Sequence, residues 1–424
     1  MLRFVAVGVP VRSGPATAPM VWFHLIFLFA IGACIGSFLN VVIWRLPRGL
    51  SIVFPGSHCP SCGRGIKWYD NIPLLSWLLL GGRCRWCRCR ISPRYLVIEG
   101  TTAVLLPGLY SWYFIFGMRQ GAGEFAGAWP MYAAHAALLC GLLACSVVDV
   151  ELWLIPLEVM WTCSLIGVAV WAGAGPHPFL RVISPDVVGV SLAAAAGLGV
   201  SLLLTRWGFL LPSFVDASDR PRREPHAEAA GAAPAEAGAR RTGGRQRSVA
   251  VTSSHGVDPR LEVLREVVFL LPAIVLATVA GAVLRHVGAA GAGWRRLLDA
   301  EVHPILAPHA LAAGSALFGY LIGGLWVWAT RILGTLGFGK EAMGMGDVHI
   351  LAAVGAVTGW IVPTIAFFLA PFFALAWGLY IRIRRRQQEL PYGPWLAVGC
   401  LATLLFYDWI VSFLTAYVTP PPVP

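Results

Sequence analysis

The stretch Gly344-Met345-Gly346-Asp347, followed by the apolar run 348–358, decides how the rest of the chain is interpreted. It predicts a short apolar helix that opens with a carboxylate at the edge of a membrane. Ionisable groups at membrane depth are costly unless they face protein or water, so Asp347 is a functional residue by default. Gly344 and Gly346 have no side chain, which allows another backbone to approach closely and permits dihedral angles barred to other residues. We therefore expect an open backbone here that could bind an extended peptide beside the carboxylate.

The composition indicates a polytopic membrane protein. Of the 424 residues, 57% are hydrophobic and 12% are charged, whereas soluble domains carry about 25% charged residues. The formal net charge is +11, and in a membrane protein such an excess belongs mainly to cytoplasmic loops. The positive charge therefore indicates orientation in a lipid bilayer, and we expect no nucleic-acid partner.

Long apolar runs predict an all-α fold with about eight to nine transmembrane helices, because one crossing needs about 20 apolar residues. We expect a tail over residues 1–20 and a first transmembrane helix within 21–46. A short helix from Asp347 and a longer one to about Tyr380 are expected before the last crossing. The remaining crossings are expected at about 96–116, 129–148, 153–172, 187–211, 266–287, 309–332 and 395–417.

Charged segments orient these crossings. The polar segment 47–95 carries many arginines against Asp70 alone, which places it in the cytoplasm by the positive-inside rule. Segment 212–260 is rich in Ala, Gly, Pro and Arg and has too little apolar surface to fold, so we expect a disordered cytoplasmic insertion. It divides the membrane part into residues 96–211 and 261–424. Alternating crossings then put Asp149 and Asp347 on the same cytoplasmic face.

Asp149 ends an apolar run and is the best partner for Asp347 in a two-carboxylate site. Like charges a few ångströms apart cannot both ionise easily, so such a pair shares one proton. The ionised member can then draw a proton from water while the protonated member polarises a carbonyl. The alternative for each aspartate is a helix N-cap, which satisfies free N–H groups and complements the helix dipole. Because both aspartates are expected on the same membrane face, we favour the two-carboxylate site over two separate N-caps.

Other ionisable residues near the two aspartates are expected in lesser roles. His349 follows Asp347 by two positions, so on a helix its side chain points elsewhere, and no second histidine lies at matching spacing for a metal. We expect His349 to make a substrate-side or interfacial contact. The nearby glutamates are expected to cap helices or line the rim of the site: Glu99, Glu151 and Glu158.

Two CxxC turns, Cys59-Pro-Ser-Cys62 and Cys84-Arg-Trp-Cys87, are separated by 21 residues, the spacing of a zinc ribbon. Each turn supplies two thiolates, and zinc takes four in a tetrahedron. Because disulfides are rare in the cytoplasm, we expect a structural zinc ion on Cys59, Cys62, Cys84 and Cys87, with Cys89 as a spare thiol. Reduced thiols or redox use are the alternatives. A closed four-cysteine site has no open position for catalysis, so the zinc would only shape this cytoplasmic domain.

These motifs together resemble the type IV prepilin peptidase family (prepilin leader peptidase/N-methyltransferase), a group of GxGD membrane aspartic proteases. The resemblance runs from about Gly36 to Val398, apart from the insertion. Asp149, seven residues before Pro156, matches the family's first catalytic aspartate, and Asp347 matches the second, in the GxGD motif. The remaining matches are the opening signature 36–47, the cysteine segment with Trp68-Tyr69-Asp70-Asn71-Ile72-Pro73, and the late element Pro391-Tyr392-Gly393-Pro394.

The resemblance implies a membrane aspartic endopeptidase of the bacterial inner membrane. Such an enzyme removes the short basic leader of type IV prepilin or type II secretion pseudopilin precursors on the cytoplasmic side. Many members then methylate the new N-terminal amine with S-adenosylmethionine. This chain departs from the family at His349, where Lys is usual, at Leu157, where Asp or Asn is common, and in its long insertion.

Two alternatives to the bifunctional enzyme are open from the residues. The first is a peptidase without methyltransferase activity, because no glycine-rich loop for the methyl donor is visible. The second is a catalytically silent membrane scaffold whose cysteine segment docks the secretion machinery. Processing of a pilin precursor and the chemistry of its new N-terminus distinguish the three.

Overall fold

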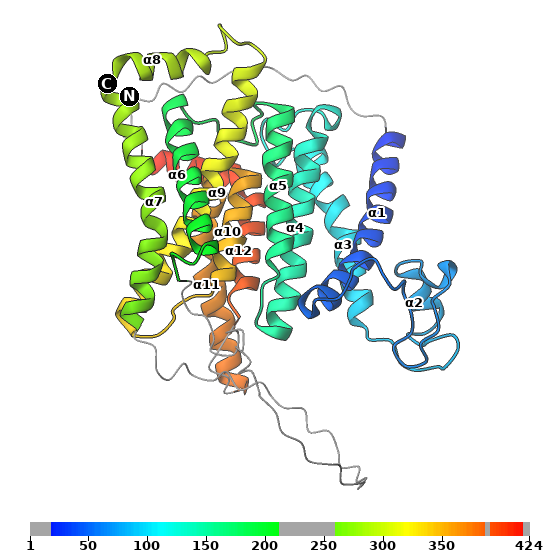
Figure 1. Cartoon of the computed structure of the whole chain (residues 1–424). Helices are drawn as coiled ribbons and strands as arrows, with labels where there is room; N and C mark the ends of the chain where they lie inside the picture. Colours follow the sequence, from blue (N-terminus) through cyan, green and yellow to red (C-terminus); the bar gives the residue numbers. More distant parts are fainter. Residues whose placement is uncertain (1–17, 212–258, 386–390, 419–424) are drawn as a thin grey trace, which may run out of the picture.

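The computed structural model describes residues 18–211, 259–385 and 391–418, which fold almost entirely as helices (Figure 1). Within these ranges the only β-type pairing is two isolated bridges, His58 with Gly65 and Arg83 with Arg90. The expected all-α membrane fold is therefore confirmed. Most of the expected tail and of the expected insertion, residues 1–17 and 212–258, lie outside the described residues.

The elements follow in chain order. The helices are α1 (Ala18–Arg45), α2 (Leu75–Leu79), α3 (Arg94–Tyr110), α4 (Phe125–Leu152), α5 (Leu157–Ala174), α6 (Pro185–Arg206), α7 (Pro259–His286), α8 (Gly288–Leu297), α9 (Leu306–Phe338), α10 (Met345–Thr358), α11 (Ile361–Arg385), α12 (Gly393–Leu405) and α13 (Tyr407–Val418). Short helical turns are formed by Leu46–Arg48, Trp68–Asp70 and the π-helical Ser111–Ile115.

In the described ranges, seven helices are long and apolar enough to cross a membrane: α1, α4, α5, α6, α7, α9 and α11. An eighth crossing results if α12 and α13 form one broken span. The expected crossing at 96–116 corresponds to α3, which has 17 α-helical residues and continues as the π-helical segment Ser111–Ile115. It is therefore helical as expected but is not one of the seven long spans.

The last expected crossing, over 395–417, corresponds to α12 and α13, which are two helices and not one straight span. α12 and α13 meet at an angle of 80°. Two contacts to the α3–α4 connection hold α13 in its direction: the Gln120 N–H donates to Asp408 Oδ2 at 2.8 Å, and Arg119 Nη1 lies 3.7 Å from Asp408 Oδ1. The 13 residues of α12 rise about 20 Å, less than the hydrocarbon core of about 30 Å. α12 alone is thus too short to cross, and a crossing here would need both helices.

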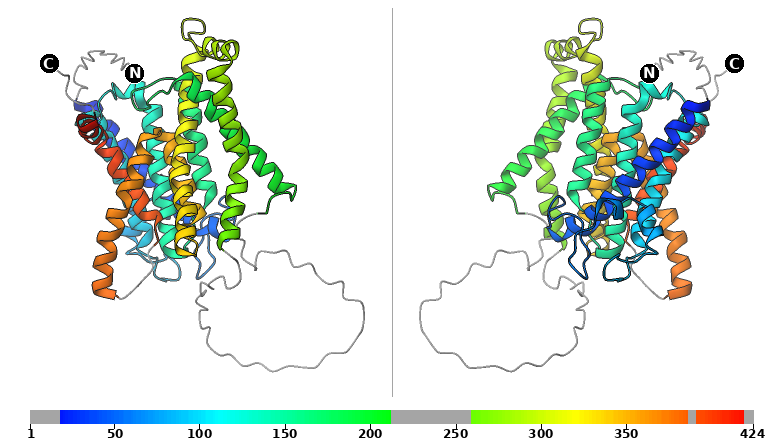
Figure 2. Two further views of the ribbon diagram at one scale, coloured as in Figure 1. Left: turned by 90° about the vertical axis from the view of Figure 1, so that its left-hand side faces the viewer. Right: turned by 90° about the vertical axis from the view of Figure 1, so that its right-hand side faces the viewer.

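Burial separates central from peripheral helices. In its most apolar stretch 67% of α4 is buried inside the protein, compared with 11% of α7. α10 is buried along nearly its whole length. The helix pair α6 and α7 lies at one edge of the bundle in green, and α1 lies toward the opposite edge in blue (Figure 2). The apolar surface of α7 is therefore left for lipid, while α4 and α10 are surrounded by protein.

α9 and α10 pack backbone against backbone. An alanine Cβ at Gly319 would overlap the Gly355 carbonyl oxygen, and one at Gly355 would overlap the Gly319 carbonyl oxygen. The same holds for Gly323 and the carbonyl oxygen of Leu351. Only glycine permits this approach, because it has no Cβ. The contact fixes α10, and with it Asp347, against the long helix α9.

This packing predicts different effects for two glycine substitutions on the same helix. Gly319→Ala should destabilise the protein by about 1–3 kcal/mol or more, because the added methyl group overpacks the interface. Gly337→Ala is the matched control, since nothing lies within 4 Å of its position, and it should be neutral or stabilising by up to about 1 kcal/mol. Thermal unfolding of the purified protein in detergent measures both. Equal unfolding midpoints for the two variants would contradict the proposed contact.

Candidate active site

Asp347 lies in the first turn of α10, and its side chain is buried with 6% exposure. The N-cap of α10 is Gly344, so the alternative that Asp347 is an N-cap is wrong. Its Oδ1 has no hydrogen-bond partner among the described residues. A buried carboxylate oxygen without a partner is costly, and in an enzyme such an atom is available to water or substrate. The position therefore fits a reactive group better than a structural one.

The two glycines of this motif have different roles. An alanine Cβ at Gly346 would lie 2.7 Å from Ile155 Cβ, so the absent side chain makes room for the α4–α5 connection. The close neighbour is thus a side chain, whereas the sequence predicted a backbone. Gly344 has φ −69° and ψ 147°, which other residues adopt readily. The expected special dihedral angle at Gly344 is wrong.

Asp149 lies in the last turn of α4 and is also buried, with 7% exposure. Its carbonyl oxygen accepts the Trp153 N–H at 2.9 Å at the end of the helix. The N-cap alternative is therefore wrong for this residue too, because it ends a helix instead of starting one. A negative charge is disfavoured at a helix C-terminus by the dipole. The carboxylate of Asp149 needs compensation from elsewhere.

That compensation comes from α12. The N–H of Gly393, the first residue of α12, donates to Asp149 Oδ2 at 3.0 Å. A helix N-terminus is a binding site for anions because its N–H groups are free and its dipole is positive there. Pro394 fits the first turn, where no N–H is needed. A Cβ at Gly393 would lie 2.7 Å from Asp149 Oδ2 and 3.4 Å from Ile350 Cδ1, so this glycine sits between α4 and α10.

The two aspartates lie at the same end of the bundle. Asp149 is near enough to Asp347 to act on it electrostatically. Tyr392, just before α12, is part of the same group, because burial together with the charge of Asp347 raises the pKa of its phenol to about 12. Arg94 Nη1 pairs with Glu151 Oε1 at 2.6 Å, which ties the end of the cysteine segment to the end of α4.

The residues expected in lesser roles, His349 and Glu99, lie in different parts of the structure. Trp161 Nε1 on α5 donates to His349 Nδ1 at 3.3 Å, so His349 lies at the α5–α10 interface. A role of His349 toward a substrate stays a prediction. Glu99 is buried, and its Oε2 accepts the Leu74 N–H at 2.7 Å. Since Leu74 precedes α2, this bond holds the cysteine segment to α3.

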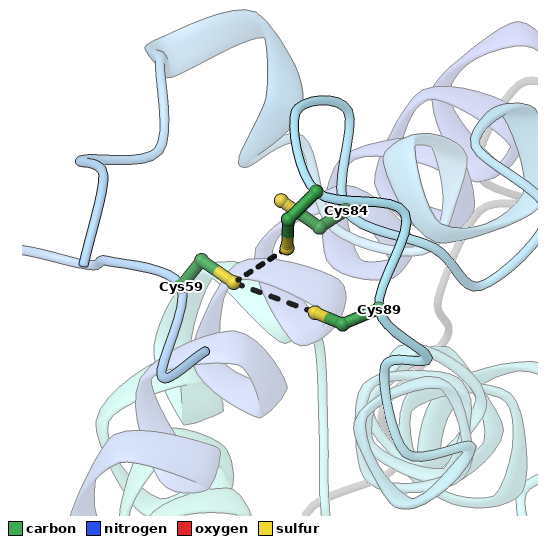
Figure 3. A group of neighbouring side chains, drawn as sticks. Cys59, Cys84 and Cys89 are labelled. Carbon is green, nitrogen blue, oxygen red and sulfur yellow. Dashed lines mark hydrogen bonds between the residues drawn. The ribbon is translucent and has the colours of Figure 1, made fainter. Parts of the chain in front are cut away.

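Four sulfur atoms gather in the segment between α1 and α3. The Sγ atoms of Cys59, Cys84, Cys87 and Cys89 all lie within 4.8 Å of one another. Cys59 Sγ is 3.7 Å from Cys87 Sγ and 3.5 Å from Cys89 Sγ, and Figure 3 shows Cys59 and Cys89 pointing toward each other. A tetrahedral zinc ion with bonds of about 2.3 Å places its sulfurs about 3.8 Å apart. The group therefore has the dimensions of a metal site.

The two cysteine turns have equivalent backbones. The Cys59 N–H donates to the Arg64 carbonyl and the Cys84 N–H to the Cys89 carbonyl, both at 2.9 Å. The N–H groups of Cys62 and Ser61 lower the pKa of Cys59 to about 6. In the second turn the N–H groups of residues 87 and 86 lower the pKa of the first cysteine, Cys84. Backbone N–H groups directed at sulfur favour the thiolate that binds metals.

The membership of this sulfur group differs from the expected one. Three of the expected ligands are present, Cys59, Cys84 and Cys87, but Cys62 is exposed and outside the group. Cys89, expected to be a spare thiol, is the fourth member. The run Cys87-Arg88-Cys89 brings a second sulfur back because Arg88 has φ +58°. Sequence spacing alone could not have distinguished Cys62 from Cys89.

Gly393 is the site residue whose role the sequence analysis missed. The segment Pro391-Tyr392-Gly393-Pro394 was matched only as part of a resemblance. A glycine and a proline directly before an apolar run are typical of a helix start, and that signal could have indicated a free N–H at membrane depth. A search for donors to the two aspartates would then have led to Gly393.

The fold and the site together define a polytopic helical membrane protein with two buried carboxylates and a cysteine group at one end of its bundle. Residues 30–114 match the family described as "Bacterial Peptidase A24 N-terminal domain". No solved structure matches the chain.

Relatives with known names agree with this class. The chain is 41% identical over 165 residues to the "Prepilin leader peptidase/N-methyltransferase" of Myxococcus xanthus, covering 39% of this chain and 45% of that protein. It is 36% identical over 185 residues to the "Type 4 prepilin-like proteins leader peptide-processing enzyme" of Escherichia coli, covering 37% and 61%. The chain spans about half the length of the curated relatives it matches. Parts of this chain are thus similar to proteins named as prepilin leader peptidases and to the N-terminal domain of that peptidase family.

The contact between Gly393 and Asp149 predicts a coupling between two substitutions. Gly393→Ala should destabilise the protein by about 1–3 kcal/mol, because the new methyl group would press on the carboxylate. In an Asp149→Ala background the same change should be much less destabilising, with a coupling of at least about 1 kcal/mol. Thermal unfolding of the four proteins measures this cycle. Additive effects would show that the two residues are not in contact.

Proposed function

We propose that this protein is an aspartic endopeptidase that removes the leader of type IV prepilin or type II secretion pseudopilin precursors. The observation that carries the proposal is the pair of buried carboxyl groups, with Asp347 in the first turn of α10 and Asp149 hydrogen-bonded to the first residue of α12. The names of the relatives support the reaction class, because they are called leader peptidases or a leader peptide-processing enzyme.

In the proposed reaction the two carboxylates share one proton. The hydrogen bond from Gly393 favours negative charge on Asp149, so the proton resides mainly on Asp347. Asp149 then takes a proton from a water molecule that attacks the scissile carbonyl, and Asp347 donates its proton to the carbonyl oxygen. The unpartnered Oδ1 of Asp347 is the atom available for this donation. As the tetrahedral intermediate collapses, Asp149 gives its proton to the leaving amine nitrogen of the mature chain, a hydroxyl of the intermediate returns a proton to Asp347, and the leader leaves with a new carboxyl group.

We place the proposed site on the cytoplasmic side of the bacterial inner membrane. The end of α4, which carries Asp149, is tied to the cysteine segment by the ion pair of Arg94 with Glu151, and residues 45–95 carry nine Lys and Arg side chains against Asp70 alone. The positive-inside rule assigns such a segment to the cytoplasmic side. A substrate with one apolar span would reach the site through the bilayer, where the short helices α10 and α12 begin.

The methyl-transfer reaction is a further part of the proposal. Its support is the printed name of several relatives, which includes N-methyltransferase. S-adenosylmethionine would supply the methyl group. No arrangement of the described residues argues for a site for this donor, so we assign no residue to it. Mass spectrometry of the mature pilin N-terminus tests this part. An unmethylated amine would exclude the methyltransferase activity and leave only the peptidase activity in the proposal.

The cysteine group is proposed to hold a structural zinc ion. Cys59, Cys84, Cys87 and Cys89 have the donor chemistry and the sulfur spacing that zinc requires. Four thiolates leave no position for a water molecule, so the ion would stabilise the cytoplasmic segment and take no part in hydrolysis.

Cleavage of a precursor tests the proposed reaction. Membranes with the wild-type protein should process a pilin-type precursor, whereas Asp149→Asn and Asp347→Asn should each lower the rate by at least about 10³-fold, because neither amide can exchange the shared proton. Asp186→Asn is the control, because Asp186 pairs with Arg295 outside the site, and it should keep the activity. Full processing by either Asp149→Asn or Asp347→Asn would exclude the dyad. If the wild-type protein does not process any precursor, the hypothesis of a catalytically silent scaffold is favoured.

Metal content tests the cysteine group. Purified protein should contain about one zinc per chain, and Cys59→Ser and Cys89→Ser should both reduce that content, because serine is a poor zinc ligand. Cys62→Ser is the matched control and should retain the metal. Elemental analysis of the three variants decides between the two ligand sets. Loss of zinc in Cys62→Ser with retention in Cys89→Ser would restore the two CxxC pairs.

A further inference from the structure

An ion pair is buried between α7 and α9. Arg331 Nε donates to Glu266 Oε1 at 2.6 Å, and both side chains are only 2% exposed. Trp328 Nε1 donates to the other oxygen, Glu266 Oε2, at 3.1 Å. Charged residues inside a membrane bundle are expensive and are kept for a function by default. Neither Arg331 nor Glu266 has a hydrogen bond to the two aspartates among the described contacts, although the charge of Arg331 acts on Asp347, so the role of the pair needs its own explanation.

Arg331 also holds the connection from α9 to α10. Its Nη1 donates to Glu341 Oε1 at 2.6 Å and to the carbonyl oxygen of Met343. One turn later on α9, Thr335 Oγ1 accepts the Ala342 N–H at 3.3 Å. The last two turns of α9 therefore fasten consecutive residues of this connection through side chains.

The fastened segment leads directly to the reactive carboxylate. Met343 precedes Gly344, the N-cap of α10, and Asp347 lies in the first turn of that helix. The glycine contacts of α9 fix α10 further along its length. Arg331 fixes the N-terminal end, where the carboxylate is. α9 thus fixes the position of Asp347 in two places, through its glycine contacts along α10 and through Arg331 at the start of α10.

We propose that Arg331, oriented by Glu266, is a positioning residue that sets the location of Asp347 through the carbonyl of Met343. This inference rests on the proposed function. Arginine suits the role because its planar fork directs N–H groups to several acceptors at once. Here one side of the fork meets Glu266 and the other meets Glu341 and Met343. The ammonium group of lysine is a point charge and cannot span both sides.

The competing explanation is that the pair only stabilises the bundle. Removing one partner of a buried ion pair leaves an uncompensated charge and is strongly destabilising, whereas neutralising both partners is often tolerated. Under that explanation, a protein without either charge would recover both stability and activity. Under the positioning role it would recover stability only, because the bond to the Met343 carbonyl is absent. The double variant Arg331→Gln/Glu266→Gln separates the two.

The test combines cleavage kinetics with a measurement of the connection itself. Arg331→Lys should lower kcat by about 100-fold with KM little changed, since a displacement of about 1 Å of a reacting group has that effect. Lys340 is exposed in the connection, so release of the connection should increase the rate at which trypsin cuts after Lys340. The double variant should unfold near the wild-type temperature and still show low kcat and fast cutting.

Arg119→Lys is the matched control, because Arg119 is also a buried arginine but touches α13 instead of this connection. It should leave both kcat and cutting at Lys340 unchanged. Wild-type kcat in Arg331→Lys, or recovery of kcat in the double variant, would overturn the positioning role. If the wild-type protein cleaves no precursor, the proposed function fails first, and unchanged protection of Lys340 in both Arg331 variants would then overturn the inference by itself.

Discussion

The structure depends on keeping two carboxyl groups inside an apolar bundle. Water cannot solvate them there, so each carboxylate needs partial positive charge from the protein. The solution is a pair of short helices that begin at one end of the bundle. Asp347 lies in the first turn of α10, and Asp149 accepts a hydrogen bond from the first residue of α12. Because both helix N-termini must meet at one place, α4, α10 and α12 have little freedom in how they pack.

This constraint explains why helices of unequal length occur together. α9 has 33 residues and can cross the membrane, whereas α10 has 14 and α12 has 13. The short helices would be poor membrane spans alone. They are stable here because longer helices surround them and because α9 contacts α10 without intervening side chains. The price of this arrangement is a bundle interior that tolerates few substitutions by larger residues.

Much of this architecture could be predicted from the sequence. Apolar runs predicted the long helices, because length and composition alone decide a membrane span, and the loop charges placed Asp149 and Asp347 on one face. Contacts between residues far apart in the chain could not be predicted from the sequence pattern. The 80° bend after α12 follows from the contact of Asp408 with Gln120, nearly 300 residues apart in the chain. The fourth sulfur is Cys89 instead of Cys62 because of one backbone turn at Arg88, which spacing does not encode.

The break in the described chain between α6 and α7 divides the site. Asp149 and the cysteine group lie before it, whereas Asp347, Gly393 and Arg331 lie after it. The two helices beside the break already fit closely, since a Cβ at Gly197 would overlap Ala273, and they stand at the lipid edge of the bundle. The geometry of the reacting groups is thus set by how the helices before the break fit against the helices after it.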